Sequence, residues 1–454
     1  MKDPLPIEVL FHIFSFLHTC RSPCGRTHCT GDTGELYWKD NAPVVQTLRS
    51  LALTSRYLNR IFTPLLYKSV VPRDEKAVAL LLRTLHEAPW LGEYVRSVGF
   101  FEKFLPGRSC GVEGERGRGA GEAAYVSMGR GVVEAVRAQF GIGPQPFIGE
   151  DASRGQTSLG DTWLWCWMVP PSPFLSPSPT NPLPNQTLYF LPHLRTLEIC
   201  PPDASKMEDD LATAWFDPYI PHGYSAPRAF SSLVSIAIYS ESKSPRGYAL
   251  SGEILFNVLR LPRLKKLEMV KVNLDRLTVP PYRSVHLGEN LTRLVWFHME
   301  EAFCDPGTLF EIFRRAPRLR RVLIQFNRAS FFDEEEEMIY GRLDEPISLL
   351  RDSVEELSIK MDRSAKGNCV WIGDLSGFSR LRSLLLDVDF WTLPEGMVGS
   401  RRTAAEYLPG GLQGLGIWDG VHGKWLFEGP YEWRWDRQRL PTIIGCQSPV
   451  SVQE

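Results

Sequence analysis

The sequence predicts an α/β protein in which a small N-terminal helical module precedes a curved solenoid of alternating strands and helices. Apolar residues recur at three- and four-residue steps within residues 4–71, which is helical spacing. A short apolar motif with period-two alternation recurs from residue 194 onward, as expected of strands. Helical stretches lie between these motifs, and several end in a proline before the next strand. The 454 residues leave room for about three domains.

Composition excludes several classes of protein. The formal net charge is −2, so bulk electrostatics favours neither nucleic acid nor an anionic membrane as a partner. The longest apolar runs fall well short of the ~20 residues that a membrane span requires. The nine cysteines are dispersed and do not form a disulfide framework, which favours a reducing compartment. We therefore expect a cytoplasmic and/or nuclear protein that binds neither nucleic acid nor membrane.

Two helical stretches are predicted at the N-terminus, over residues 4–17 and 44–71. Asp3 stands at an N-cap position, Pro6 falls in the first turn, where proline is tolerated, and Glu8 suits the positive end of the helix dipole. An apolar stripe of this kind must be buried, either on the rest of the chain or on a partner. The stripe consists of Ile7, Leu10, Ile13, Phe14, Leu17, Leu48, Leu51, Leu58, Ile61 and Phe62.

Together these stretches resemble an F-box, the helical module that docks on the Skp-type adaptor of cullin-RING ubiquitin ligases. The match covers Leu5-Pro6-x-Glu8-Val9-Leu10, Ile13-Phe14, Leu17 and the stretch from Leu51 to Tyr57. Two departures are a loop over Cys20–Pro43, where the family has a short turn, and Tyr57, where an F-box usually has Trp. The resemblance implies that residues 1–72, with the insertion 20–43, bind the adaptor. The implied adaptor-binding residues are Leu5, Pro6, Val9, Leu10, Ile13, Phe14, Leu17, Leu53 and Tyr57.

The insertion 20–43 contains Cys20, Cys24, His28 and Cys29. Zinc requires four thiolate or imidazole ligands, and this spacing is not a common closed pattern. We interpret the segment as a polar insertion with incidental cysteines, with a structural zinc site as the alternative. We expect no metal and no cofactor.

Residues 73–101 form a first repeat-like unit, in which a helical stripe is stopped by Pro89 and followed by a strand. Residues 102–188 break this pattern, because they are rich in Gly and Arg and then in Pro and Ser. We interpret them as a low-complexity, disordered insertion. Within it, Trp163–Met168 is either a strand added to a sheet edge or part of that insertion, and we favour the insertion.

A motif of the form L-x-x-L-x-L recurs over residues 189–420, with starts 27 to 39 residues apart. This series resembles the leucine-rich repeat, although the family's asparagine is missing after most strands. Each motif predicts a strand with inward leucines, and stacked repeats bury what one repeat alone cannot. Residues 421–454, which include Trp425, Trp433 and Trp435, are expected to form a C-terminal cap and tail. The motifs start at Leu194, Leu233, Leu264, Leu291, Leu319, Val354, Leu381 and Leu412.

The sequence contains none of the nucleophile, metal or phosphate-loop motifs that would indicate an enzyme, so we expect no catalytic residue. The resemblance implies a substrate-recognition subunit of a Skp–cullin–F-box ubiquitin ligase, with a Skp-type adaptor, a cullin complex and a target protein as partners. Such a subunit supplies proximity rather than chemistry. The alternative is a repeat scaffold whose F-box has diverged and which belongs to no ligase.

The target-binding surface is predicted from the residue just before the second leucine of each motif. Three consecutive motifs place Lys266, Arg293 and Arg321 there, so three cations are expected in one row. An acidic or phosphorylated segment would relieve their mutual repulsion, with Phe297 and Tyr239 offering apolar contact beside it. The alternative interpretation is that Glu268 and Glu356 neutralise the row, or that the row is solvated.

Overall fold

The computed structural model describes most of the predicted strands and the second N-terminal helical stretch. The chain divides into two compact units, Met1–Glu241 with Leu261–Arg263, and Ser242–Arg260 with Leu264–Glu454. Each unit is considered by itself. The described residues are 33–72, 75–100, 187–188, 190–199, 228–239, 248–250, 255, 258–274, 292–327, 343–362, 372–387, 404–419 and 424–428.

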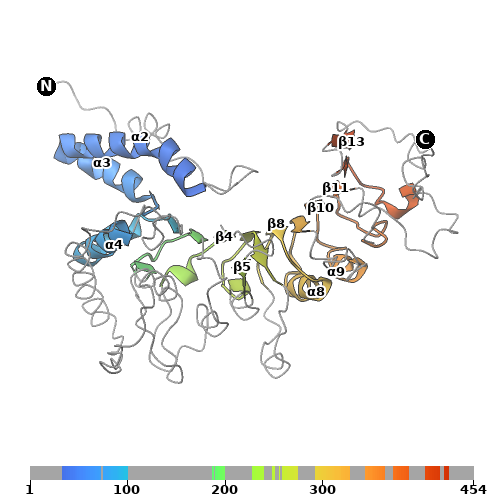
Figure 1. Cartoon of the computed structure of the whole chain (residues 1–454). Coiled ribbons are helices and arrows are strands. Elements are labelled where there is room, and N and C mark those ends of the chain that lie inside the picture. The colour runs from blue at the N-terminus through green and yellow to red at the C-terminus, as the bar shows by residue number, and fades with distance from the viewer. Residues whose placement is uncertain are drawn as a thin grey trace, which may run out of the picture. The chain divides into compact units, whose positions relative to one another are not determined.

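Two helices, α2 (Thr33–Thr54) and α3 (Arg56–Tyr67), lie side by side at the start of the described chain (Figure 1). The pair is held by an apolar core in which Leu48, Ile61 and Phe62 are fully buried. Ser55 separates the helices, because its backbone is extended and its hydroxyl accepts a hydrogen bond from Leu58 N at 3.1 Å. It is therefore the N-cap of α3.

This helical pair differs from the sequence prediction at both ends. Helix α2 begins at Thr33, inside the predicted loop 20–43, and continues through Pro43. Proline removes one intrahelical backbone hydrogen bond, and the hydroxyl of Thr47 donates to Pro43 O at 2.8 Å one turn later. The second stretch, predicted over residues 44–71, breaks at Ser55 and gives way to strand β1 (Ser69–Val70). Residues 1–32 lie outside the described part of the chain.

The first unit continues with a helix and four parallel strands. Helix α4 (Glu75–Glu87) buries the expected stripe, and the 3-10 helix η2 (Pro89–Glu93) follows it at the predicted proline. Strand β2 (Ser97–Phe100) lies between β1 and β3 (Thr196–Ile199), and β4 (Ser235–Tyr239) pairs with β3. A second 3-10 helix, η8 (Arg228–Ser231), precedes β4. The buried residues of the α4 stripe are Val78, Leu81, Leu82 and Leu85.

The second unit contains a larger sheet whose strands follow one another in chain order. All neighbouring strands in it pair in parallel except the last two, which are antiparallel. Helices α8 (Pro306–Arg315) and α9 (Asp344–Ser348) lie side by side on one face of this sheet (Figure 1). The strands in spatial order are β6 (Lys266–Val270), β8 (Trp296–Ala302), β9 (Arg321–Asn327), β10 (Glu356–Asp362), β11 (Ser383–Asp387), β12 (Gly414–Asp419) and β13 (Lys424–Glu428).

Two smaller features complete the second unit. Strands β5 (Tyr248–Ala249) and β7 (Val272–Asn273) pair in parallel as a separate two-stranded sheet. The 3-10 helix η11 (Ala404–Tyr407) precedes β12. The combination of helices with parallel strands confirms the predicted α/β class. No described helix has the length and apolar character that a membrane crossing would need.

The motif leucines form the core of both units. Leu264, Leu319 and Leu381 are each at most 1% exposed, and each precedes the first residue of its strand by two positions. At the starts of β2 to β4 and of β8 to β12, two consecutive backbone N–H groups donate to one carbonyl that precedes or begins the neighbouring strand. Arg320 and Arg321, for example, both donate to Val295 O, at 2.9 and 3.1 Å. This repeated bond fixes the register from strand to strand.

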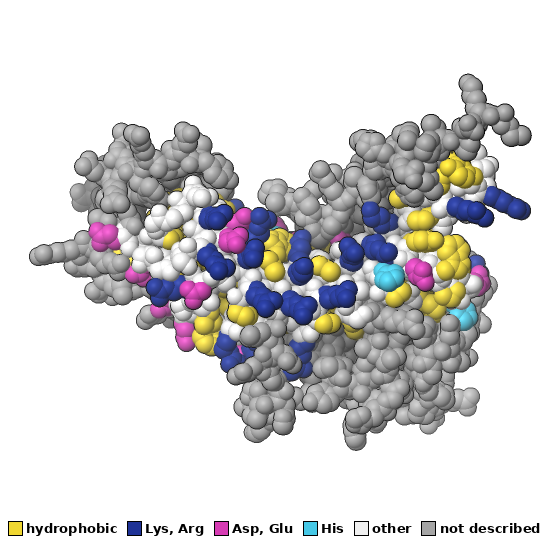
Figure 2. Space-filling model, turned by 180° about the vertical axis from the view of Figure 1, so that it is seen from behind, with side chains coloured by type: hydrophobic (Ala, Val, Ile, Leu, Met, Phe, Trp, Pro, Cys, Tyr) yellow, Lys and Arg dark blue, Asp and Glu magenta, His cyan; other side chains and the backbone are white. Residues whose placement is uncertain are grey.

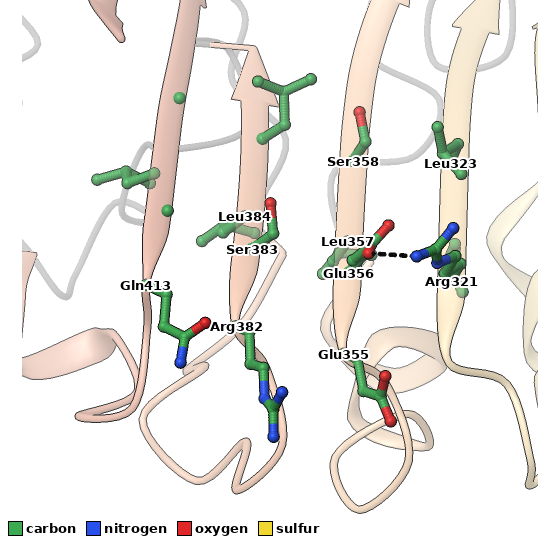
Figure 3. Close-up of a pocket in the computed structure, with 15 residues that line it drawn as sticks. Arg321, Leu323, Glu355, Glu356, Leu357, Ser358, Arg382, Ser383, Leu384 and Gln413 are labelled. Carbon is green, nitrogen blue, oxygen red and sulfur yellow. Dashed lines mark ion pairs between the residues drawn. The ribbon is translucent and has the colours of Figure 1, made fainter. Parts of the chain in front are cut away.

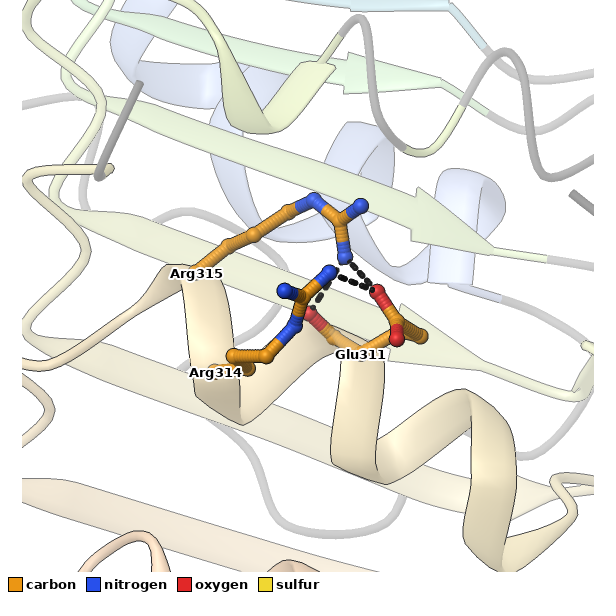
Figure 4. A network of polar contacts seen from close by, with 3 residues as sticks. All are labelled: Glu311, Arg314 and Arg315. Carbon is orange, nitrogen blue, oxygen red and sulfur yellow. Dashed lines mark hydrogen bonds and ion pairs between the residues drawn. The ribbon is translucent and has the colours of Figure 1, made fainter. Parts of the chain in front are cut away.

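Helix α8 shows how a helical stretch between motifs is positioned. Asp305 caps it by accepting from Thr308 N at 3.0 Å, and its buried face packs on the core through Ile312 and Phe313. At the other end Glu311 binds both Arg314, at 2.9 Å, and Arg315 (Figure 4).

The electrostatic environment of Glu311 follows from this arrangement. Partial burial raises the pKa of the carboxyl, but the hydrogen bonds and positive charges of Arg314 and Arg315 outweigh it and hold the pKa below its ordinary value. The carboxylate therefore stays ionised and links the last two turns of α8.

Candidate functional site: the outward face of the strands

The outward face of the larger sheet carries the residues on which the target-binding prediction rests. In a strand, alternate side chains point to opposite faces, so the strand-start residues share the face opposite to the buried motif residues that follow them. The register aligns these starts across neighbouring strands. The resulting row is Lys266, Trp296, Arg321, Glu356, Ser383 and Gly414.

The predicted cation row is wrong at one position. Trp296, rather than Arg293, pairs with Lys266 on one side and Arg321 on the other. Arg293 is exposed but precedes strand β8 by three residues. The error arose because both Leu291 and Leu294 are followed by apolar residues at motif spacing, and the chain uses Leu294, which is fully buried.

Lys266 and its neighbours form a compact cluster on β6 and β8. Lys266 Nζ lies 3.2 Å from Glu268 Oε2 and 3.8 Å from the ring centroid of Trp296. His298 Nδ1 lies 3.4 Å from the other oxygen of Glu268, at ion-pair distance but without hydrogen-bond alignment. The Glu268 side chain is only 4% exposed, so its charge is compensated by Lys266. The aromatic ring adds a cation–π contact to the same ammonium group.

Arg321 is also matched by an acid. Its guanidinium lies 2.9 Å from the Glu356 carboxylate (Figure 3). Arg320 beside it lies 3.7 Å from Glu355. Both pairs join β9 to β10 and are half exposed, so each contributes little to stability. The alternative interpretation, in which Glu268 and Glu356 neutralise the row, is therefore confirmed for Lys266 and Arg321.

The two aromatic residues predicted to contact a target face the core instead. Phe297 is fully buried and packs edge-to-face on Phe313 of α8, with ring centroids 5.9 Å apart. Tyr239 is 4% exposed. Phe297 takes the place of the motif's second leucine, and Tyr239 ends a strand buried over four consecutive residues, so neither offers an exposed contact.

Farther along the strands, the outward face carries a second charged group. Burial lowers the pKa of the Lys360 ammonium, and the nearby charges of Asp387 and Glu300 act in the opposite direction without cancelling it. Asp387 itself is fully buried. The face thus carries partly or fully buried charges toward the C-terminal ends of its strands and exposed charges at their N-terminal ends.

A groove of about 670 Å³ runs across β9, β10, β11 and β12 on this face (Figure 3). Its hollow shape has a sequence cause, since small residues occupy several outward positions of β10 to β12, beside the larger Glu356 and Leu385. Little side-chain volume is provided by Ser358, Ser383, Gly414 and Gly416. On the neighbouring strand β9, the larger side chains of Arg321 and Leu323 project farther outward. Sequence reasoning noted these outward positions only for their charge and missed the run of Ser and Gly.

A smaller hollow of about 310 Å³ shares Glu355 and Arg382 with the groove. Arg380 and Arg382 contribute two guanidinium groups to it, and Gly411 leaves its floor open because a Cβ there would meet nothing within 4 Å. Neither arginine side chain forms an ion pair with any residue that the structure describes. The hollow therefore has the residues to bind an anion.

The predicted adaptor-binding residues fall into two groups. Leu53 at the end of α2 is 75% exposed, and Tyr57 at the start of α3 is 43% exposed. Both are apolar or aromatic side chains on the outside of a helical pair that already has its own core. The other predicted adaptor contacts, Leu5, Pro6, Val9, Leu10, Ile13, Phe14 and Leu17, lie outside the described residues.

The possible zinc ligands and the tryptophan segments cannot be placed. Cys20, Cys24, His28 and Cys29 lie outside the described residues, as does Trp163–Met168. Within the described ranges no group of three or more His, Cys, Asp or Glu side chains is positioned to hold a metal ion. In the predicted cap, Lys424–Glu428 forms β13, while residues 429–454 are not described.

Comparison with protein-family models and with curated proteins finds no match to this chain. The functional interpretation therefore rests on the residues and on their geometry. Two surfaces stand out on that basis, namely the outer side of the α2–α3 pair and the groove across β9 to β12.

Proposed function

We propose that the protein is a non-catalytic substrate-recognition subunit of a cullin-RING ubiquitin ligase of the Skp–cullin–F-box type. In this proposal the N-terminal helical module is an F-box that binds the Skp-type adaptor. The strands form a curved leucine-rich-repeat solenoid that binds a target protein in the cytoplasm or nucleus. The protein then acts by raising the effective concentration of the target near the ubiquitin-transfer machinery.

The exposure of Leu53 and Tyr57 carries the adaptor half of the proposal. A leucine that is 75% exposed on a helix gains little from folding, because most of its side chain stays in water. Leu48, Ile61 and Phe62 meanwhile satisfy the internal core of the same pair. Leu53 and Tyr57 are also the positions at which the F-box resemblance implies adaptor contacts. Burial against a partner would therefore supply a free-energy gain that the isolated pair lacks.

The order of the strands supports the repeat half of the proposal. Parallel strands that follow the chain in order, each entered through the same motif and the same pair of backbone hydrogen bonds, are what stacked repeats produce. Helix α8 lies between β8 and β9 in the chain, and α9 lies between β9 and β10, so each connects consecutive parallel strands. The outward face is then continuous from strand to strand and offers the surface that a target would contact.

Adaptor binding by the purified full-length protein tests the proposal. We expect the wild type to bind a Skp-type adaptor, and Leu53→Asp to weaken binding by about tenfold or more, because a charge enters a desolvated contact. The matched control is Leu349→Asp, which changes another partly exposed leucine, 37% exposed, in the second unit. Loss of binding in both variants, or none by the wild type, would favour the alternative of a repeat scaffold outside any ligase.

A further inference from the structure

Two cations line the groove across β9 to β12 and the smaller hollow beside it, Arg382 in both and Arg380 in the hollow, and neither forms an ion pair with a described residue. Four of the charged residues around it form pairs, since Arg321 binds Glu356 and Arg320 binds Glu355. Arg380 and Arg382 are exposed, share the smaller hollow and lack an acidic partner among the described residues. Two guanidinium groups that line one hollow repel each other, and an anion bound between them relieves the repulsion.

Further basic residues stand just before the starts of other strands in this sheet. Arg293 and Arg318 each stand one residue before the first motif leucine of their strand, as Arg380 does. Lys265 occupies the position directly before its strand, as Arg382 does. Basic side chains gather in a band on the face of the molecule shown in Figure 2, with few acidic ones among them. Arg293, Arg318 and Lys265 thus add positive charge just before the strand starts, as the two arginines of the hollow do.

The dimensions of the groove suit an extended peptide. Four adjacent strands at a spacing of about 4.8 Å span about 14 Å, which four or five residues of extended chain cover at about 3.3 Å each. Hydrogen-bonding groups lie along this path on Gln413, Ser383 and Ser358. At the far end Leu323 provides an apolar contact beside the Arg321–Glu356 pair. The path therefore runs from cations, through small polar residues, to a mixed apolar and acidic end.

We propose that this groove binds an extended segment of a partner protein that has a cluster of Asp or Glu residues at one end and uncharged residues at the other. The acidic end lies against Arg380 and Arg382, and the uncharged end crosses Ser383 and Ser358 toward Leu323. The inference deepens the proposed function, because the partner would be the ligase target. It places target binding at the β9 to β12 end of the outward face, where Arg321, but not Lys266, is among the lining residues.

The paired glutamates distinguish a peptide from a nucleic acid. A single-stranded nucleic acid carries a phosphate on every nucleotide, so it would bring negative charge next to Glu355 and Glu356. A peptide with acidic residues at one end only avoids that repulsion at Glu356, where its backbone N–H groups can donate instead, while its acidic end meets Glu355 together with Arg380 and Arg382 in the smaller hollow. The groove therefore favours a segment of uneven charge over a uniform polyanion.

Fluorescence anisotropy of a labelled synthetic peptide tests the proposal with the purified full-length protein. The probe has about ten residues, with Glu at four positions near one end and Ser, Gly and Leu in the rest. We expect measurable binding that weakens as salt is raised, because exposed charges are screened. A peptide with Lys in place of Glu should not bind. A uridine homopolymer RNA should bind more weakly than the acidic peptide.

Three variants separate the groove from general electrostatic attraction. Arg380→Glu combined with Arg382→Glu should weaken peptide binding by about tenfold or more, whereas Arg314→Glu, an exposed arginine on α8, should not. Ser383→Trp should weaken binding by filling the groove without a change of charge. Far-ultraviolet circular dichroism checks that each variant is folded.

The proposal fails if the wild type does not bind the acidic peptide, if Arg314→Glu weakens binding as much as the double variant, or if Ser383→Trp has no effect. It also fails if the RNA binds more tightly than the peptide. The adaptor takes no part in the measurement. If the protein does not bind the peptide, the adaptor proposal still stands. If the protein does not bind the adaptor, the peptide measurement keeps its meaning.

Discussion

Lys266 Nζ lies 3.8 Å from the ring centroid of Trp296, its register partner on the adjacent parallel strand. This contact joins two strands at the position where the sequence pattern predicted a second cation. Trp296 therefore converts an expected repulsion into an attraction.

A double-mutant cycle on this pair measures the attraction. Lys266→Met and Trp296→Leu, alone and together, should show a coupling of about 0.5–1 kcal/mol in the free energy of unfolding, determined by urea denaturation. The control is a second cycle that combines Lys266→Met with Gln413→Ala, at the other end of the same sheet, and there the two effects on the free energy of unfolding should add. Additive behaviour of Lys266 and Trp296 would show that the contact adds no stability.

Ser55 sets the start of α3, so its replacement tests the break between the two N-terminal helices. Ser55→Ala removes the hydroxyl that accepts from Leu58 N, and we expect a loss of about 1 kcal/mol in the free energy of unfolding. Ser50→Ala in the exposed interior of α2 is the matched control and should be neutral or slightly stabilising. An equal effect of both substitutions would contradict the capping role.

Gly92 lies against the backbone of a segment far away in the sequence. A Cβ atom at this position would come far too close to Phe190 O, a main-chain atom that cannot rotate away. Gly92→Ala should therefore lower the melting temperature and cost about 1–3 kcal/mol or more. Gly410→Ala, where nothing lies within 4 Å, should have little effect. A stable Gly92→Ala protein would show that these two segments can move apart.

Glu311 predicts a loss of stability in acid. Because Arg314 and Arg315 hold its pKa below 4.5 in the folded state, the unfolded state binds a proton more readily as the pH falls. Its stabilising contribution is therefore present above about pH 4.5 and disappears as the pH falls through the folded-state pKa. The advantage of the wild type over Glu311→Gln in urea denaturation should shrink between about pH 7 and about pH 3.

The control for this measurement is Glu345→Gln. Glu345 is exposed on α9 and forms no ion pair with a described residue. Its substitution should leave the difference from the wild type nearly constant over the same pH interval. A constant difference for Glu311→Gln as well would remove the Arg314–Arg315 cluster as a source of acid sensitivity.

The period of the apolar residues was sufficient to predict most of the strands. Leu264, Leu319 and Leu381 each stand two residues before a strand, as the motif requires. At the fourth motif Leu291 and Leu294 both satisfied the pattern, and only the backbone hydrogen bonds from Val295 and Trp296 to Lys265 O distinguish them. Local spacing cannot resolve such a choice, because register depends on the neighbouring strand.

The candidate site was less predictable than the fold. The prediction of Lys266 and Arg321 as target-binding residues rested on charge alone. Their pairing with Glu268 and Glu356 depends on distances that the sequence does not contain. The groove depends on Ser and Gly at outward positions, which appear in the sequence only as unremarkable small residues. The exposure of Leu53 was not predictable from the sequence either. Helix α2 ends at Thr54, one residue after Leu53, whereas the predicted helix continued beyond this point.

Strand β13 has a consequence for self-association. It pairs antiparallel with β12, with Gly416 opposite Glu428 and Asp419 opposite Lys424. The backbone groups along that side of β12 are thus occupied by the chain itself, and the irregular register between Ile417 and Trp418 interrupts a flat edge. An open parallel edge would offer a template on which further copies could add strand by strand into insoluble aggregates. The edge passes instead to β13, a strand of only five residues that begins with Lys424 and ends with Glu428, and a short edge strand with charged ends disfavours such growth.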